Sequence, residues 1–198
     1  WDSVFKTIRQ PVWWKGDSEY NKPGYEEPAS LLEKRLRNGE FVIATEVAPP
    51  LGANPAKLIR EIELVKPYVT AVNFTDASSA TPKMSGIACC KVANDLHCEA
   101  VFQIAARDTT RSGLQSAVIG SGQMGVKNIL CVTGDNPKVG PSPTSDMNFV
   151  DVDSVQMLWI LRRMRDEGIY LDGRKIKYPP KFFLGAATTP FTSDPELQ

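Results

Sequence analysis

Two acidic residues in this sequence stand where chemistry could occur, because each follows a stretch that predicts a buried strand. The run Phe41–Thr45 is apolar and rich in β-branched residues, and it stops at Glu46, just before a rigid double proline. The segment Asn128–Pro137 repeats this plan with a buried apolar run, a glycine that allows close backbone approach, and then Asp135 at the tip. Carboxylates at the ends of two parallel strands predict the rim of an active site.

These acids belong to a chain in which strand and helix alternate five times. Strands are predicted at Phe41–Thr45, Ala71–Thr75, Ala100–Ala105, Asn128–Thr133 and Phe182–Ala187. Each is a continuous apolar run, which predicts an α/β fold with a parallel sheet covered on both faces. No GxGxxG motif or Walker-type phosphate loop follows any strand, so a doubly wound nucleotide fold is disfavoured and a (β/α)8 TIM barrel is favoured.

Helix signals fill the segments between these strands. Ser30 and Glu33 predict a capping box, and Thr110 starts a later helix. Two further helices are predicted, one opened by Thr81 and Pro82 with Met84, Ile87, Ala88, Val92 and Leu96 as its apolar side, and one from about Asp153 carrying Val155, Leu158 and Trp159. A complete barrel takes about 250 residues. With about five strand–helix units, the chain is therefore expected to lack the C-terminal part of the barrel.

The composition limits the class of protein. The chain has 198 residues, of which 42% are hydrophobic, enough to bury the core of one domain. Its 23 basic and 23 acidic residues balance, and no basic stripe with interleaved aromatics suggests nucleic acid as a partner. No stretch is long and apolar enough to span a membrane, and nothing at the N-terminus resembles a signal peptide, so a cytoplasmic location is expected.

The cysteines and the N-terminal segment carry less specific signals. The four cysteines show no CxxC spacing and His97 is the only histidine, so we expect buried, reduced thiols rather than a metal site. Residues 1–29 are rich in aromatics and broken by proline and glycine, which predicts an extended arm that packs on the domain or on a partner. Because the chain begins at Trp1 rather than Met, we expect a fragment or a processed product.

All five predicted strands end in polar residues, as a site for a polar ligand requires. These residues are Glu46; Asn73, Thr75 and Asp76; Gln103, Arg107 and Asp108; Thr133 and Asp135; and Thr188 and Thr189. Strand ends also meet solvent, which accounts for polar residues without any function. The pattern alone therefore does not identify a ligand.

Five segments at these strand ends, in this order and spacing, resemble the methylenetetrahydrofolate reductase family: FVIATEVAPP, AVNFTDASSA, FQIAARDTTRSGLQS, NILCVTGDNP and FFLGAATTP. The resemblance covers about Ser30 to Gln198. It implies a TIM barrel that holds a flavin, usually FAD, with FMN also possible. It further implies reduction of 5,10-methylenetetrahydrofolate to 5-methyltetrahydrofolate by hydride transfer from the reduced flavin, in the one-carbon metabolism that serves methionine biosynthesis.

The resemblance also implies catalytic and substrate-binding roles for the two acids. Glu46 matches the family's acid that protonates the folate amine and opens the methylene bridge to an electrophilic iminium. This chemistry needs a protonated carboxyl group, which burial at a barrel mouth would favour. Asp135 matches an acid near flavin and folate, whose negative charge would influence the flavin and favour a cationic iminium.

The positions that the resemblance assigns to the cofactor are Asn73, Phe74, Thr75, Gln103, Arg107, Asp108, Thr133, Gly134 and Thr189, and no metal is implied. At Asn73 and Gln103, better-studied relatives carry different side chains. Some relatives have an arginine where Thr133 stands, and a Tyr-Pro pair in place of Thr189-Pro190. The missing tyrosine ring leaves open how nicotinamide and folate would stack here.

The resemblance divides the chain into an arm, residues 1–29, and a flavin- and folate-binding barrel domain, residues 30–198. Later barrel strands of the family, which supply a folate-binding glutamine and further cofactor contacts, have no counterpart in this sequence. The segment from Trp1 to Phe5 resembles the tail of a cysteine-rich zinc module that accompanies some reductases. This implies a homo-oligomer or hetero-complex, with electrons from NAD(P)H or from a partner electron-transfer subunit.

Two other interpretations stay open. The first is a flavin-free TIM-barrel enzyme that binds a pterin, which a flavin absorption band would separate from a reductase. The second is a non-catalytic barrel subunit of a larger redox complex, with the aromatic arm as its docking segment. Glu46 and Asp135 favour an enzyme, because a barrel without catalysis has no evident use for an acid at the end of a buried strand.

Overall fold

The described residues form one sheet of five parallel strands. The computed structural model describes residues 25–142 and 150–187. The strands are β1 Ala44–Val47, β2 Ala71–Phe74, β3 Ala100–Ala105, β4 Asn128–Val132 and β5 Phe183–Ala186, and each pairs with the next along the chain. This sequential order is that of one arc of a (β/α) barrel, so the predicted α/β class and barrel topology are confirmed.

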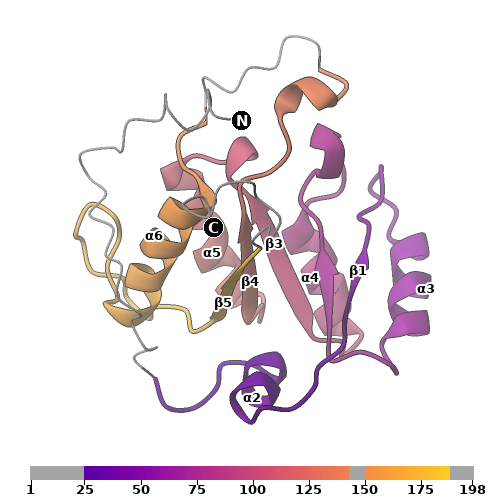
Figure 1. Cartoon of the computed structure of the whole chain (residues 1–198), viewed down its shortest axis with the longest axis horizontal. Helices are drawn as coiled ribbons and strands as arrows, with labels where there is room; N and C mark the ends of the chain where they lie inside the picture. The colour runs from indigo at the N-terminus through magenta and orange to yellow at the C-terminus, as the bar shows by residue number, and fades with distance from the viewer. Residues whose placement is uncertain (1–24, 143–149, 188–198) are drawn as a thin grey trace, which may run out of the picture.

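In the described chain, one helix precedes β1, and the other helices connect the strands and lie on one side of the sheet. They are α2 Leu31–Arg37, α3 Ala56–Val65, α4 Gly86–Asp95, α5 Arg111–Gln123 and α6 Ser154–Asp166, with short 3₁₀ turns η1 Ser78–Ala80, η2 Ala106–Asp108 and η3 Pro137–Val139. Parallel crossovers are right-handed, so a sheet in sequential order places α3 to α6 on the same face. In Figure 1, α3 and α6 flank the sheet at its two ends, and α2 lies below the strands. Among the described residues, the connecting helices therefore cover one face of the sheet, which is the outer face of a barrel.

Alternate side chains along the strands separate a buried outer face from an open inner face. Phe74 and Phe102 face the helices and are buried, and the backbone of α4 at Gly86 comes so close that a Cβ there would lie 3.2 Å from the Phe102 ring. Fully burying one such side chain stabilises the fold by about 1.5–3 kcal/mol. On the inner face Asn73 and Gln103 are only partly buried. The inner face is thus where a ligand could reach the sheet.

β1 differs from the predicted buried strand. Phe41 is 90% exposed and Ile43 52% exposed, the strand begins only at Ala44, and Glu46 lies within it rather than after it. The reason is that β1 is an edge strand: within the described chain it pairs with β2 on one edge, and no strand pairs with its other edge. Only Val47 of this strand is buried.

Two helix starts illustrate which local signals hold. Thr110 caps α5 as predicted, because its hydroxyl accepts a hydrogen bond from Gly113 N at 3.1 Å. The helix predicted from Thr81 begins instead at Gly86, since Met84 N donates to Pro50 O at 2.8 Å and holds the preceding residues as a loop. The fully buried residues of α4 are Gly86, Cys89, Cys90 and Ala93. The predicted apolar residues Met84, Ile87, Val92 and Leu96 are partly buried and pack against the same core.

The start of α6 agrees with the prediction. Asp153 caps the helix in a full capping box with Gln156. The buried side chains are Gln156, Met157, Ile160, Leu161 and Met164, whereas Val155 is 56% exposed. Of the apolar residues predicted on this helix, Leu158 and Trp159 are partly buried and pack against the core.

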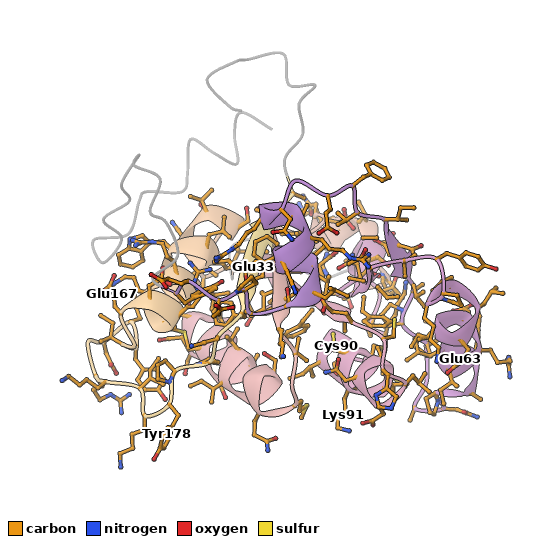
Figure 2. All side chains as sticks on the ribbon, turned by 90° about the horizontal axis from the view of Figure 1, so that it is seen from below. Glu33, Glu63, Cys90, Lys91, Glu167 and Tyr178 are labelled. Carbon is orange, nitrogen blue, oxygen red and sulfur yellow. The ribbon has the colours of Figure 1, made fainter. Side chains whose placement is uncertain are left out.

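α2 closes the lower end of the sheet, where the strands begin. The Glu99 carboxylate accepts hydrogen bonds from Leu31 N and Leu32 N, each at 2.8 Å. Glu33 is 1% exposed, and Figure 2 shows it from below on α2. The predicted capping box is half formed: Ser30 Oγ accepts from Glu33 N, but the Glu33 carboxylate reaches Ala29 N rather than Ser30 N.

The Glu33 carboxylate ties three segments together. It accepts hydrogen bonds from the Tyr25 hydroxyl at 2.9 Å and from Arg37 Nη2 at 2.6 Å. The same hydroxyl lies 3.2 Å from Phe182 O, beside β5, so its single proton is shared between two acceptors. Burial, and then the hydrogen bond to Glu33, raise the pKa of Tyr25 to about 12. The phenol therefore stays protonated and keeps the chain before α2 fixed to the far end of the sheet.

Three further predictions concern the cysteines, membrane-spanning helices and the two ends of the chain. All four cysteines are free and buried, as predicted. Among the described residues, no helix combines the length and apolar character that crossing a membrane needs. Most of the predicted arm, and Thr188 and Thr189, lie outside the described residues.

Candidate active site

The inner face carries a row of polar side chains across three neighbouring strands. Glu46 of β1 pairs in register with Asn73 of β2. Asn73 Nδ2 donates to Glu46 Oε2 at 3.4 Å and to Gln103 Oε1 of β3 at 2.9 Å. The Asn73 amide thus turns its NH₂ group toward both oxygens and donates one hydrogen to each. The same NH₂ group fixes the oxygen of Gln103, and within the described part of the chain no hydrogen bond engages the Gln103 NH₂, which can face a ligand.

Two buried oxygens on this face lack partners. Asn73 Oδ1 and Thr75 Oγ1 have no hydrogen-bond partner among the residues that the structure describes. They stand two positions apart at the end of β2, so both belong to the inner face, and Thr75 is only 6% exposed. A buried polar atom left without a partner costs about 1–3 kcal/mol. A ligand with hydrogen-bond donors along one edge would remove this cost.

The loop after β4 brings Asp135 to the same end of the sheet. Asp135 is exposed, and its Oδ2 accepts a hydrogen bond from Ser79 N in the loop after β2 at 2.9 Å. Gly134 has φ +91°, and a Cβ there would lie 3.2 Å from both the Ala105 and the Arg107 Cβ atoms. The predicted close backbone approach at this glycine is thus present.

Arg107 lies beneath these loops. Its side chain is 2% exposed, and its guanidinium donates to Ala77 O at 3.0 Å, to Asp135 O at 3.1 Å and to the Asp108 carboxylate. The hydrogen bond to Asp108 is the main cause that raises the pKa of Arg107. One buried cation therefore contacts the loops after β2, β3 and β4.

A second acid supports the same loops from the end of β2. Asp76 Oδ2 accepts a hydrogen bond from Ala105 N at 3.0 Å, which joins the ends of β2 and β3. Burial raises the pKa of Asp76, partly opposed by this hydrogen bond. The sequence pointed to Asp76 only as one polar strand end among several.

Comparison with known protein families identifies the lineage of this site. A family model described as methylenetetrahydrofolate reductase matches residues 31–182. The chain belongs to the methylenetetrahydrofolate reductase family. A search among curated proteins found no match. The matched region holds Glu46, Asn73, Gln103 and Asp135, so the inner-face row and the Asp135 loop both belong to the family domain.

This family is a TIM-barrel family whose members generally depend on a flavin. A flavin presents N–H and C=O groups along one edge of its ring system, together with a broad apolar surface. The unpaired Asn73 and Thr75 oxygens match the N–H groups, and the free Gln103 NH₂ matches a carbonyl. The inner face therefore fits the group that the family uses.

Glu46 is placed differently from the prediction. It was expected to be buried at a barrel mouth, but its side chain is exposed because β1 is the edge strand of the described sheet. Its carboxylate nevertheless points to the inner face, where Asn73 holds it. The structure thus joins Glu46 to the predicted cofactor residues Asn73 and Gln103, without the predicted burial.

The remaining predicted cofactor residues lie at varied distances from this face. Phe74 is fully buried against the helices, so a cofactor contact there would have to come from its backbone. Thr133 Oγ1 donates to Ser154 Oγ at the start of α6, at 3.0 Å. Asp108 is half exposed beside Arg107, with 47% of its side chain accessible. Thr189 lies outside the described residues.

Proposed function

We propose that this chain reduces 5,10-methylenetetrahydrofolate to 5-methyltetrahydrofolate with a bound flavin. The observation that carries the proposal is the hydrogen-bonded row of Glu46, Asn73 and Gln103 on the open inner face. It combines a possible proton donor with amide groups suited to a flavin edge, within the family domain. The reaction class follows from that combination.

Glu46 is the general acid in this proposal. Its proton passes to the folate amine, the carbon–nitrogen bond of the methylene bridge breaks, and the bond electrons stay on that amine. The bridging carbon becomes an iminium that accepts a hydride and ends as a methyl group. Asn73 holds the carboxylate in place during this transfer, because its NH₂ group faces Glu46.

Asp135 binds the substrate and stabilises the cation. Its Oδ2 is held by Ser79 N, so the carboxylate keeps a fixed direction at the end of the sheet. A fixed negative charge near the iminium lowers the free energy of the cationic intermediate relative to the neutral folate. The same carboxylate can accept hydrogen bonds from the folate ring.

Asn73, Thr75 and Gln103 are the residues that we propose to hold the flavin, with the backbone at Gly134 allowing close approach. The flavin, FAD or alternatively FMN, supplies the hydride when bound. Further proposed contacts come from Phe74, Asp108, Thr133 and Thr189, whereas Arg107, which is buried beneath the loops, supports the site without touching the flavin. The inner face provides the polar groups that orient the ring and the apolar side chains that exclude water from it.

We further propose a division of labour along the chain. Residues 30–198 bind flavin and folate, and residues 1–29 form a docking arm. Electrons come from NAD(P)H or from a partner subunit bound through that arm, in a homo-oligomer or hetero-complex located in the cytoplasm. Tyr25, fixed by Glu33, would attach such an arm to the barrel domain.

The test uses the full-length protein, purified without added cofactor. Any bound flavin is reduced by light without oxygen, methylenetetrahydrofolate is added, and the visible flavin band is followed. Return of the band supports the proposal. A flavin that stays reduced contradicts the folate assignment, and a preparation without a flavin band favours the flavin-free pterin enzyme or the structural subunit.

A further inference from the structure

We propose that Arg107 is a positioning residue for Asp135. In this inference, Arg107 fixes the backbone of Asp135 and of the turn at residues 77–80. One oxygen of the Asp135 carboxylate is then held by Ser79 N while the other faces the ligand. The inference rests on the substrate-binding role proposed for Asp135.

The contacts of Arg107 point toward the protein and away from a ligand. Its side chain is 2% exposed, whereas the side chain of the neighbouring Asp108 is 47% exposed. Its donors go to Ala77 O, Asp135 O and the Asp108 carboxylate. A planar guanidinium donates in fixed directions from three nitrogens, whereas a lysine ammonium donates from one nitrogen and cannot reach the same three separated acceptors in this geometry.

Asp135 is held at two places. Its backbone carbonyl accepts from Arg107 Nη1 at 3.1 Å, and its Oδ2 accepts from Ser79 N at 2.9 Å. Within residues 25–142 and 150–187, no hydrogen bond engages Oδ1, and the residue is exposed. The carboxylate is therefore oriented but keeps one oxygen for a ligand.

The turn that supplies Ser79 N is strained. Ala77, Ser79 and Ala80 have φ values of +41°, +56° and +51°, in the left-handed region that residues other than glycine seldom adopt. Such a backbone persists only where its surroundings hold it. Here Arg107 holds Ala77 O and Asp135 holds Ser79 N.

Close packing on the other side of the turn makes this arrangement tight. A Cβ at Gly140, just after η3, would lie 2.5 Å from Ala80 O. The loop after β4 thus presses directly on the strained turn. Releasing the Arg107 contacts should let the turn relax and should free Asp135 Oδ2 with it.

The experiment compares Arg107→Lys with Arg174→Lys in the full-length protein. Arg174 also pairs with a nearby aspartate, Asp172, but its side chain is 77% exposed. In Arg107→Lys, amide hydrogen exchange at residues 77–80 should rise about tenfold or more, because the turn opens locally. Exchange in β3 should stay unchanged. Arg174→Lys should match the wild type in both segments.

Kinetics then connect the turn to the ligand. Arg107→Lys should raise the KM for methylenetetrahydrofolate about tenfold, which corresponds to the loss of one oriented hydrogen bond to a charged group. Flavin content should not change. Adding Asp135→Asn to Arg107→Lys should cause little further rise, because both substitutions disable the same carboxylate.

Several results would overturn this inference. Unchanged exchange at residues 77–80 in Arg107→Lys removes the positioning contact. Faster exchange with a normal KM, while Asp135→Asn raises KM, shows that Arg107 does not act through Asp135. If Asp135→Asn leaves KM and the flavin half-reaction normal, the role proposed for Asp135 fails, and the positioning role falls with it even when exchange rises.

A second variant covers the case in which Arg107→Lys does not fold. Asp135→Ala removes the acceptor of Ser79 N but leaves the ion pair of Arg107 and Asp108 in place. Exchange should then rise at residues 77–80 alone. Exchange equal to the wild type would show that the carboxylate does not hold the turn.

Discussion

Charged clusters at the two ends of the sheet use their charges in opposite ways. At the lower end, Glu33 is buried and its carboxylate is surrounded by donors from Tyr25, Arg37 and Ala29 N. At the upper end, Arg107 is buried and directs its donors at the Asp108 carboxylate and at two loop carbonyls. The lower cluster buries a carboxylate, that of Glu33. The upper cluster buries a cation, Arg107, and leaves the carboxylates of Asp108 and Asp135 exposed.

The difference separates stability from function. The buried Glu33 carboxylate joins α2 to the chain before it and, through Tyr25, to Phe182 beside β5. The lower end of the sheet is therefore held together by these contacts. Enclosing Arg107 shapes three loops while Asp135 stays exposed to a ligand. In this fold, the end of the barrel where the strands begin serves stability, and the end where they finish carries the chemistry.

The largest expected effect tests the upper end. Glu46→Gln should slow reoxidation of the reduced flavin by methylenetetrahydrofolate about 100-fold or more, because a general acid contributes 10² to 10⁴ in rate. Flavin content and thermal stability should stay at wild-type values, since Glu46 is exposed. Anaerobic stopped-flow absorbance measures the rate. Normal reoxidation would remove Glu46 from the mechanism.

The next effect tests the lower end. Glu33→Ala should lower the free energy of unfolding by about 2–3 kcal/mol, because Tyr25 and Ala29 N lose a buried charged acceptor. Urea unfolding measures the change, and the rate of the folate half-reaction at low temperature should be unaffected. Glu63→Ala is the matched control, since that side chain is 45% exposed and should cause no measurable change. Equal effects from both would remove the special role of Glu33.

A smaller effect is expected at Asp135. Asp135→Asn should raise the KM for methylenetetrahydrofolate about tenfold through the loss of a charged hydrogen bond. The free energy of unfolding should change little, because the amide oxygen can still accept from Ser79 N. Steady-state kinetics and urea unfolding give the two values. A large loss of stability with normal KM would make Asp135 a structural residue like Glu33.

The smallest effect concerns Asp76 and its pH dependence. Burial raises the pKa of Asp76 in the folded protein above the unfolded value of about 3.9. The folded state therefore binds this proton more tightly, and its contribution to stability, full below about pH 4, is lost as the pH rises through the folded pKa. Asp76→Asn should avoid this loss, so its free energy of unfolding should fall less than that of the wild type as the pH rises from 4 to 7. Urea unfolding between pH 4 and 7 measures it, and a variant less stable than wild type at pH 7 would contradict it.

Much of the sheet could be predicted from sequence because the inner strands are buried by their own neighbours. β2, β3 and β4 appear as continuous apolar runs, and their bounds agree with the predicted ones to within one residue. β1 misled the prediction, because its burial depends on what lies beside the sheet edge. Phe41 and Ile43 have the composition of a buried strand but lie exposed before it.

The sequence predicted which residues belong to the candidate site, but it did not predict how they contact one another. Strand ends identified Glu46, Asn73, Gln103 and Asp135 as polar positions on one rim, and the structure joins the first three. The strained turn had no signal, because residues 77–80 contain no glycine to mark a left-handed backbone. The burial of Arg107 depends on three loops far apart in sequence, which local patterns do not encode.

The reactivity of the four buried cysteine thiols can report when this fold opens. They are Cys89 and Cys90 on α4, Cys98 just before β3, and Cys131 in β4. Burial raises the pKa of Cys89 to about 11 and that of Cys131 to about 12, so the closed protein offers almost no thiolate to a labelling reagent at neutral pH. Labelling must therefore wait until the helix layer separates from the sheet. The reaction rate with a simple disulfide reagent would time that separation without any introduced probe.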